Sequence, residues 1–196
     1  MESIKKFKDN DDYVIKLSDD NIINIIGTKG SGKTTTSQQY ISNDDYIVVN
    51  CDRLFDMPEN IKLDKEFIKL KEYLVYKFGD LSKVEDFSQV YDSIIDYITK
   101  LNKVPVIEGN IIQDLPIDTI KGKIIVKRTA VFKSFYRAVK RDYKNEYFMK
   151  LEKESHKYIY KFTRLKKITK RRLKIFNQAH SINNLIDSYE NRNIKK

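Results

Sequence analysis

The stretch that most constrains this chain is residues 27–34, which read GTKGSGKT. The stretch fits the pattern G-x-x-x-x-G-K-[ST] at every fixed position. Apolar residues, NIINIIG, lead into it, and a predicted helix over residues 33–41 follows it. A buried strand, a glycine-rich turn and a helix in this order predict a P-loop, the phosphate-binding loop of an α/β domain. The fixed positions are Gly27, Gly32, Lys33 and Thr34.

Each part of this loop has a predicted role in holding a nucleoside triphosphate. The glycines let the backbone turn tightly and present its N–H groups inward, which forms a cradle for anions. Lys33 is expected to reach the outer phosphates, and the Thr34 hydroxyl to bind Mg²⁺. ATP and Mg²⁺ are therefore the predicted cofactors. The residues predicted to bind the nucleotide are Gly27, Thr28, Lys29, Gly30, Ser31, Gly32, Lys33, Thr34 and Thr35.

Short apolar stretches alternate with amphipathic ones along the first two thirds of the chain. Strands are predicted over residues 13–18, 21–27, 46–50, 104–109 and 122–127, and helices over residues 33–41, 64–79, 84–102 and from residue 131 onward. Buried strands separated by helices are typical of βαβ units. The predicted fold class is therefore α/β, a three-layer α/β/α P-loop NTPase with a parallel sheet and a basic helical C-terminal appendage.

The net charge of +10 comes from the C-terminal part of this 196-residue chain. Residues 155–186 contain nine Lys or Arg and no Asp or Glu, whereas the rest of the chain is nearly balanced. This run is either a surface for an anionic ligand, nucleic acid included, or a solvated helix face. We predict a nucleotide-binding domain over residues 1–145 and a basic helical lid or appendage over residues 146–196.

Cysteine usage and hydropathy suggest where the chain works. Cys51 is the single cysteine, which excludes an internal disulfide and favours a reducing environment. No apolar run approaches the roughly 20 residues that a membrane span needs, and the N-terminus does not have the pattern of a secretory signal. We therefore expect a cytoplasmic protein that does not contact a membrane. Nothing in the sequence indicates an oligomeric state.

Two carboxylates follow predicted strands. Asp52 comes after YIVVNC, and Glu108 ends VPVIE. Ligands of open α/β sheets bind beyond the carboxyl ends of the strands, so parallel strands would bring both acids to the edge that carries the glycine-rich loop. One acid could then accept a proton from a hydroxyl, and the other could hold Mg²⁺. The alternative for each is an ordinary strand-end acid that caps a turn.

The stretches NIINIIGTKGSGKTT, VVNCDRLF, VPVIEGNII and KIIVKRTAVFKSFYRAVKRD together resemble the uridine kinase and phosphoribulokinase group of small P-loop kinases. The resemblance covers residues 20–145. It implies that Asp52, followed by Phe55, is the base for the acceptor hydroxyl, and that Glu108 lies beside the metal. It also implies that Arg137 and Arg141 face the donor phosphates.

The chain departs from that group at three places. Residues 127–129 read Lys-Arg-Thr where the group is acidic, and Leu54 and Phe55 stand where it has a tyrosine. The C-terminal third, from Glu146 on, has no counterpart in the group. These departures concern the acceptor and leave phosphoryl transfer as the expected reaction.

Three functions remain open from the sequence. The first is a kinase that transfers the ATP γ-phosphate to a hydroxyl of a nucleoside or another small molecule. The second is a polynucleotide 5′-kinase or zeta-toxin-like kinase, whose large anionic acceptor would bind residues 155–186, with Tyr158 and Tyr160 stacking on bases. The third is an NTPase or nucleotide switch that is not a kinase.

Overall fold

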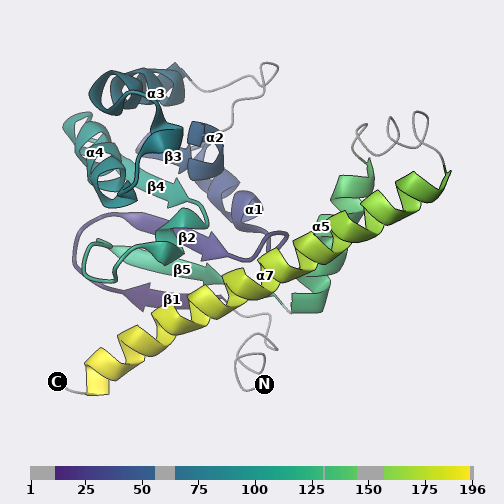
Figure 1. The fold of residues 1–196 in the computed structure, drawn as a ribbon. Coiled ribbons are helices and arrows are strands. Elements are labelled where there is room, and N and C mark those ends of the chain that lie inside the picture. Colours follow the sequence, from purple (N-terminus) through teal and green to yellow (C-terminus); the bar gives the residue numbers. More distant parts are fainter. Residues whose placement is uncertain (1–11, 56–64, 130, 145–156, 195–196) are drawn as a thin grey trace.

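The computed structural model describes residues 12–55, 65–129, 131–144 and 157–194 (Figure 1). A five-stranded sheet lies at its centre, in the order β1-β5-β2-β4-β3. The strands are β1 (Tyr13–Lys16), β2 (Ile23–Gly27), β3 (Tyr46–Asn50), β4 (Val104–Glu108) and β5 (Lys123–Lys127). The predicted α/β class is confirmed, and each described strand lies within a range predicted from the apolar stretches.

The sheet is mixed, so the prediction of a wholly parallel sheet is wrong at one edge. Strands β5, β2, β4 and β3 are parallel, whereas β1 pairs with β5 in the antiparallel direction. Only residues 17–22 join β1 to β2. A parallel crossover takes about a dozen residues or more, so this short link forces β1 to run the other way.

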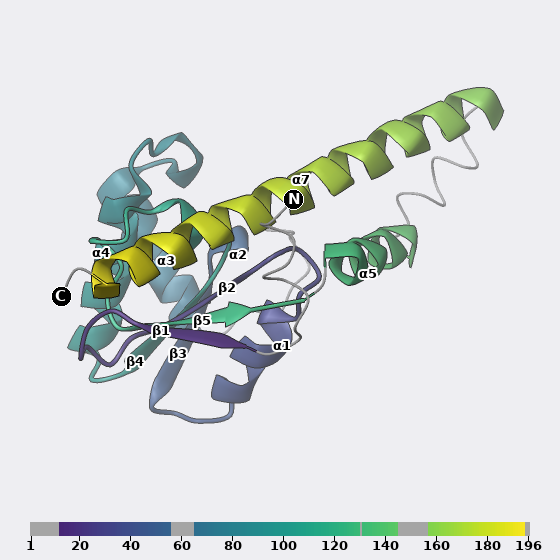
Figure 2. The ribbon, with the colours of Figure 1, turned by 90° about the horizontal axis from the view of Figure 1, so that it is seen from below.

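Helices lie on both faces of the sheet, as Figure 2 shows. Between β2 and β3 the chain forms α1 (Lys33–Ser37) and η2 (Gln38–Tyr40), and α2 (Cys51–Phe55) follows β3 directly. The helices that precede β4 are α3 (Lys65–Phe78), η3 (Leu81–Lys83) and α4 (Phe87–Lys100). The remaining ones are η4 (Ile111–Asp114), α5 (Val131–Lys144) and α7 (Lys157–Ile194).

The main hydrophobic core lies between one face of the sheet and helices α3, α4 and α7. Alternate residues of β2 and β5, such as Ile26 and Val126, point into it. A smaller cluster of Ile23, Ile25 and Val106 occupies the other face, where Tyr40 at the end of η2 packs against it. The two faces are therefore covered unequally, with most of the apolar burial on the α7 side.

A buried polar network crosses the main core. Asn24 of β2 donates from Nδ2 to the Lys121 carbonyl at 2.8 Å, and its Oδ1 accepts from the Tyr91 hydroxyl at 3.0 Å. The Lys121 N–H in turn donates to the Tyr91 oxygen at 3.2 Å. Because buried polar groups cost stability unless they are paired, these reciprocal bonds allow two polar side chains in an apolar core.

Helix α7 is part of this core over its second half, whereas we expected an appendage. The helix has 38 residues; its second half crosses the sheet face diagonally, and its first half extends beyond the sheet past α5 (Figure 1). Five of its apolar side chains are buried in the main core: Ile175, Ala179, Ile182, Leu185 and Ile186. The predicted boundary near residue 145 lies among residues 145–156, outside the described residues.

Among the described residues, no helix combines the length and the apolar character that a membrane span requires.

Candidate functional site

The carboxyl ends of the parallel strands meet at one edge of the sheet. The register pairs Asn50 of β3 with Glu108 of β4, and Ile25 of β2 with the same Glu108. On the other side of β2, Gly27 pairs with Lys127 of β5. Glu108 and the start of the glycine-rich loop, residues 27–34, therefore share this edge, as the sequence predicts. Asp52 lies two residues beyond Asn50, at the start of α2.

Backbone conformation favours glycine at two positions of the loop, and close packing adds a second reason at one of them. Gly30 and Gly32 have φ angles of +88° and +99°, which favour glycine. A Cβ atom on Gly30 would also lie 2.7 Å from the Ser134 carbonyl oxygen of α5, whereas one on Gly32 would meet nothing within 4 Å. The loop is thus tightly packed on its α5 side and open in front of Gly32, where α1 begins.

Lys33 folds back into the loop. Its ammonium donates to the carbonyl oxygens of Gly27, at 2.8 Å, and Thr28, at 3.3 Å, and the side chain is buried. A buried ammonium requires hydrogen-bond acceptors or an anion, since desolvation of an unpaired charge is costly. The loop thus holds one positive charge within its own turn.

Glu108 connects the loop helix to two strands. Its Oε1 accepts from the Thr34 hydroxyl at 2.8 Å, and its Oε2 from the Ser37 hydroxyl at 2.8 Å and from Asn50 Nδ2 at 3.3 Å. Only 3% of this residue is exposed, so the carboxylate depends on these donors. They fix both of its oxygens at the end of β4.

Thr34 and Glu108 also form a donor set that fits Mg²⁺. Hydroxyl and carboxylate oxygens are hard ligands, and Mg²⁺ is commonly held by one or two such groups while phosphates and waters complete its shell. Within the described part of the chain, no three His, Cys, Asp or Glu side chains gather into a metal-binding group. A divalent ion at this edge would therefore depend on these two residues and on its ligand.

Neighbouring elements support the rest of the loop. The Thr28 hydroxyl donates to Ser134 Oγ of α5 at 2.9 Å, and the Thr129 hydroxyl donates to the Ser31 carbonyl at 3.1 Å. The Lys29 N–H donates to Gln178 Oε1 of α7 at 2.9 Å. Helices α5 and α7, far apart from the loop in sequence, thus fix its first half.

Three supporting residues were missed by sequence reasoning. Ser37 lies three positions after Thr34, so helical spacing could have placed it on the same face. Asn50 ends β3 and accepts from the Arg53 N–H, so a strand-end Asn before a helix was a recognisable cap. No local pattern marks Gln178, because its role depends on how α7 crosses the sheet.

Asp52 is exposed in the first turn of α2, next to the close contact of Cys51 with Gly109, the residue after β4. A Cβ atom on Gly109 would lie 2.7 Å from Cys51 Cβ, so glycine at this position lets α2 pack on the end of β4. Burial raises the pKa of the Cys51 thiol well above its usual range, which keeps the thiol neutral. Cys51 is therefore a packing residue, and Asp52 is the accessible group.

Asp52 opens onto a groove of about 580 Å³ between η4 and α7. Its wall includes Gln178, the same residue that contacts the loop. The groove residues are Asp52, Asn110, Ile111, Gln113, Asp114, Lys170, Leu173, Lys174, Asn177, Gln178 and Ser181.

The two predicted arginines differ in what the structure describes. Arg137 lies in α5 with its side chain exposed, and its Nη1 is 3.5 Å from the Gly30 carbonyl oxygen, at the limit for a hydrogen bond. Arg141 belongs to the same helix, but its side chain lies outside the described residues. Thr35 is exposed in α1.

The basic run of residues 155–186 falls mostly in α7. Lys170, Arg172 and Lys174 are exposed there, whereas the side chains of Tyr158 and Tyr160 lie outside the described residues.

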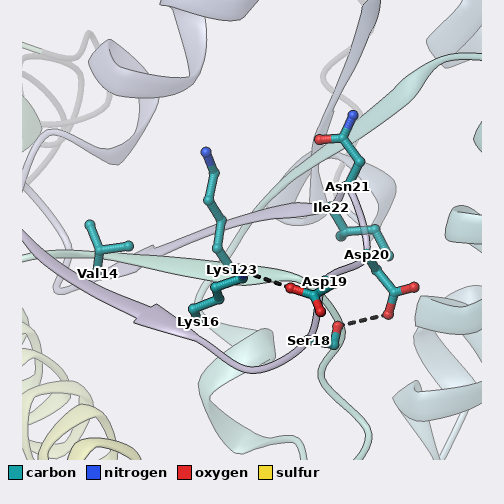
Figure 3. Close-up of a pocket in the computed structure, with 8 residues that line it drawn as sticks. All are labelled: Val14, Lys16, Ser18, Asp19, Asp20, Asn21, Ile22 and Lys123. Carbon is teal, nitrogen blue, oxygen red and sulfur yellow. Dashed lines mark hydrogen bonds and ion pairs between the residues drawn. The ribbon is translucent and has the colours of Figure 1, made fainter.

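A second hollow lies at the opposite end of the strands, near the turn after β1 (Figure 3). Its polar groups bond to one another: Lys16 pairs with Asp19 at 2.6 Å, and the Ser18 hydroxyl donates to Asp20 at 2.7 Å. Since this hollow is about 290 Å³ and two of its charges, Lys16 and Asp19, are already paired, it is a weaker site candidate than the Asp52 groove.

The sequence was compared with protein-family models and with curated proteins. No protein-family model matches the chain, and no curated protein matches its sequence.

Proposed function

We propose that this chain is a P-loop kinase that transfers the γ-phosphate of ATP to a hydroxyl acceptor, with Mg²⁺ as cofactor. The observation that carries the proposal is the 2.8 Å contact between the Thr34 hydroxyl and Glu108. It joins the last residue of the G-x-x-x-x-G-K-[ST] pattern to a buried carboxylate on the neighbouring parallel strand. The acceptor is a nucleoside or another small molecule.

On the donor side, the loop amides and Lys33 bind the triphosphate. Lys33 is already inside the loop, and it would exchange the Gly27 and Thr28 carbonyls for phosphate oxygens. Thr34 and Glu108 would hold Mg²⁺, which supplies positive charge to the β- and γ-phosphate oxygens when bound. Arg137 and Arg141 of α5 are the remaining candidates for contact with the phosphates.

On the acceptor side, Asp52 is proposed as the general base. Its carboxylate accepts the proton of the acceptor hydroxyl while that oxygen forms a bond to the γ-phosphorus. The bond between the γ-phosphorus and the β–γ bridging oxygen breaks, and ADP leaves with that oxygen. The position of Asp52 supports this role, because it is exposed at the strand edge that carries the loop.

The test is to follow the γ-phosphate label of ATP across a panel of nucleosides, sugars and 5′-hydroxyl oligonucleotides. We expect label on a small hydroxyl compound with the wild-type chain, and loss of transfer with Asp52→Asn while ATP still binds. Asp44→Asn is the matched control, since it removes an exposed carboxylate next to the opposite end of β3. Control activity should equal that of the wild type.

Two results would reject the proposal. Label that appears only as free phosphate would indicate an NTPase, and full transfer by Asp52→Asn would exclude Asp52 as the base. Transfer restricted to oligonucleotides would keep the kinase reaction and move the acceptor site to the basic run of α7.

A further inference from the structure

The groove beside Asp52 has two chemically different walls. One wall is formed by α2 and η4, and the other by α7. Figure 1 shows α7 passing in front of strands β2, β5 and β1. The two walls come from segments more than fifty residues apart, so the groove exists only in the folded chain.

The α2 and η4 wall carries hydrogen-bond acceptors beside the apolar Ile111, and one of them, Asp114, is hydrogen-bonded to Ser181 of α7. Asp52 and Asp114 contribute carboxylates, and Asn110 and Gln113 contribute amide oxygens. Asn110 Oδ1 and Gln113 Oε1 are both buried and have no hydrogen-bond partner among the described residues. Gln113 as a whole is 7% exposed. Buried acceptors without a partner are costly to stability, and both belong to residues that line the groove.

The α7 wall is basic with an apolar centre. Lys170 and Lys174 lie one helical turn apart and line the groove, with exposed Leu173 between them. Both ammonium groups belong to exposed residues, and neither has an ion-pair partner among the described residues. Two unpaired cations one turn apart can bind a single anionic group from the same side.

We infer that the groove binds an acceptor that carries an anionic group in addition to its hydroxyls, with the anion on Lys170 and Lys174 and the hydroxyl end against Asp52 and Gln113. This inference rests on the proposed function for the role of Asp52 as base. It deepens that function by giving the acceptor's chemical class, a small polyhydroxylated anion. It also assigns Lys170, Lys174 and Gln113 as residues that determine specificity.

The size of the groove favours a small molecule over nucleic acid. A volume of about 580 Å³ falls in the range of roughly 300–1,000 Å³ of ordinary small-molecule sites. The α2 and η4 wall includes Asp52, the proposed base. A single small molecule could therefore contact the recognition residues and the base at the same time. A polynucleotide would instead need cations along a longer track.

The test compares binding of matched neutral and phosphorylated compounds. The probes are ribose with ribose 5-phosphate and cytidine with cytidine 3′-monophosphate, titrated by calorimetry into the full chain with Mg²⁺ and a non-hydrolysable ATP analogue. We expect the phosphorylated member of at least one pair to bind about tenfold more tightly. Lys170→Gln and Lys174→Gln should each remove about fivefold of that preference.

Lys100→Gln is the control for the loss of one charge. Lys100 is an exposed residue at the C-terminal end of α4, which leads into the start of β4 and so lies at the opposite edge of the sheet. We expect its preference for the phosphorylated probe to equal that of the wild type. An equal fall in all three variants would show only an effect of net charge and would overturn the inference.

Gln113→Leu provides a readout that a purely structural role would not give. Removing a buried acceptor without a partner should leave the melting temperature unchanged or raise it, while probe affinity falls by about fivefold. A large fall in melting temperature would show that Gln113 serves the fold and would overturn its assignment.

Three further results would overturn the inference: equal binding within each pair, no binding by any probe, or competition by an oligonucleotide stronger than by either monophosphate. Because the readout is binding, its failure is separable from that of the proposed function. Lysine-dependent binding in a chain that transfers no label would reject the kinase and keep the anion groove. Transfer of label to a neutral compound, without lysine-dependent binding of an anion, would keep the kinase and reject the anion groove.

Discussion

Replacing Ser37 with alanine tests whether Glu108 is held in place by the helix that follows the glycine-rich loop. The Ser37 hydroxyl has one proton and two acceptors within reach, Glu108 Oε2 at 2.8 Å and the Thr34 carbonyl at 3.1 Å. The shorter distance and the negative charge favour the carboxylate. Only 2% of Ser37 is exposed, so water cannot readily replace the lost donor.

The expected loss of stability follows from two opposing effects. A buried hydrogen bond to a charged group contributes about 1.5–3 kcal/mol. The better helix propensity of alanine offsets about 0.5 kcal/mol of this. We therefore expect the free energy of unfolding to fall by about 1–2.5 kcal/mol, which for a chain of this length lowers the melting temperature by about 2–10 °C.

Urea unfolding followed by circular dichroism measures this difference. Thr35→Ala is the control, since Thr35 is an exposed threonine of the same helix. Its stability should change by less than about 0.5 kcal/mol. A change in Ser37→Ala no larger than in the control would refute the reasoning, because Glu108 would then not depend on the Ser37 hydroxyl.

Three other substitutions test the geometry around this edge and in the core. Gly109→Ala places a Cβ atom 2.7 Å from Cys51 Cβ, so urea unfolding should show a loss of about 1–3 kcal/mol, and an unchanged midpoint would contradict the close contact. Glu108→Gln should raise the Mg²⁺ concentration for half-maximal label transfer by roughly tenfold or more, and an unchanged Mg²⁺ titration would exclude Glu108 from the metal site. Burial raises the pKa of Tyr91 from 10.0 to about 12, so the unfolded phenol ionises first and wild-type stability falls as the pH rises through that interval. Tyr91→Phe should be less stable at neutral pH, because Asn24 loses a hydrogen-bond partner. In unfolding measured across pH, this variant should also lack the part of the alkaline loss of stability that Tyr91 causes. An alkaline loss identical to that of the wild type would refute this prediction.

Local patterns predicted the strands and the shared edge because those features depend on neighbouring residues. The stretch YIVVN is β3 over the predicted residues 46–50, and strands β2 and β4 are parallel as expected. Glycines followed by Lys33 and Thr34 at fixed spacing located the loop, because a few consecutive residues determine both the turn of the backbone and the start of the helix. The same reasoning placed Asp52 and Glu108 near it.

The parts that depend on long-range packing were not predictable in this way. The direction of β1 follows from the short link of residues 17–22 and from its pairing with β5, which no single-strand pattern contains. The contact between Gln178 and the Lys29 N–H, and the groove beneath α7, depend on the angle at which that helix crosses the sheet. The change from the α/β pattern to basic helix suggested an appendage there, whereas Ile182 and its apolar neighbours bury the second half of α7.

The central claim is that the loop of residues 27–34 binds a Mg-nucleoside triphosphate through Lys33. Calorimetric titration of ATP with Mg²⁺ into the wild-type chain and into Lys33→Ala tests it most directly, with Lys133→Ala, an exposed lysine of α5, as the control. The account predicts Mg²⁺-dependent binding by the wild type and the control, and affinity at least about tenfold weaker for Lys33→Ala. Equal affinity in all three chains, or no binding by the wild type, would contradict it.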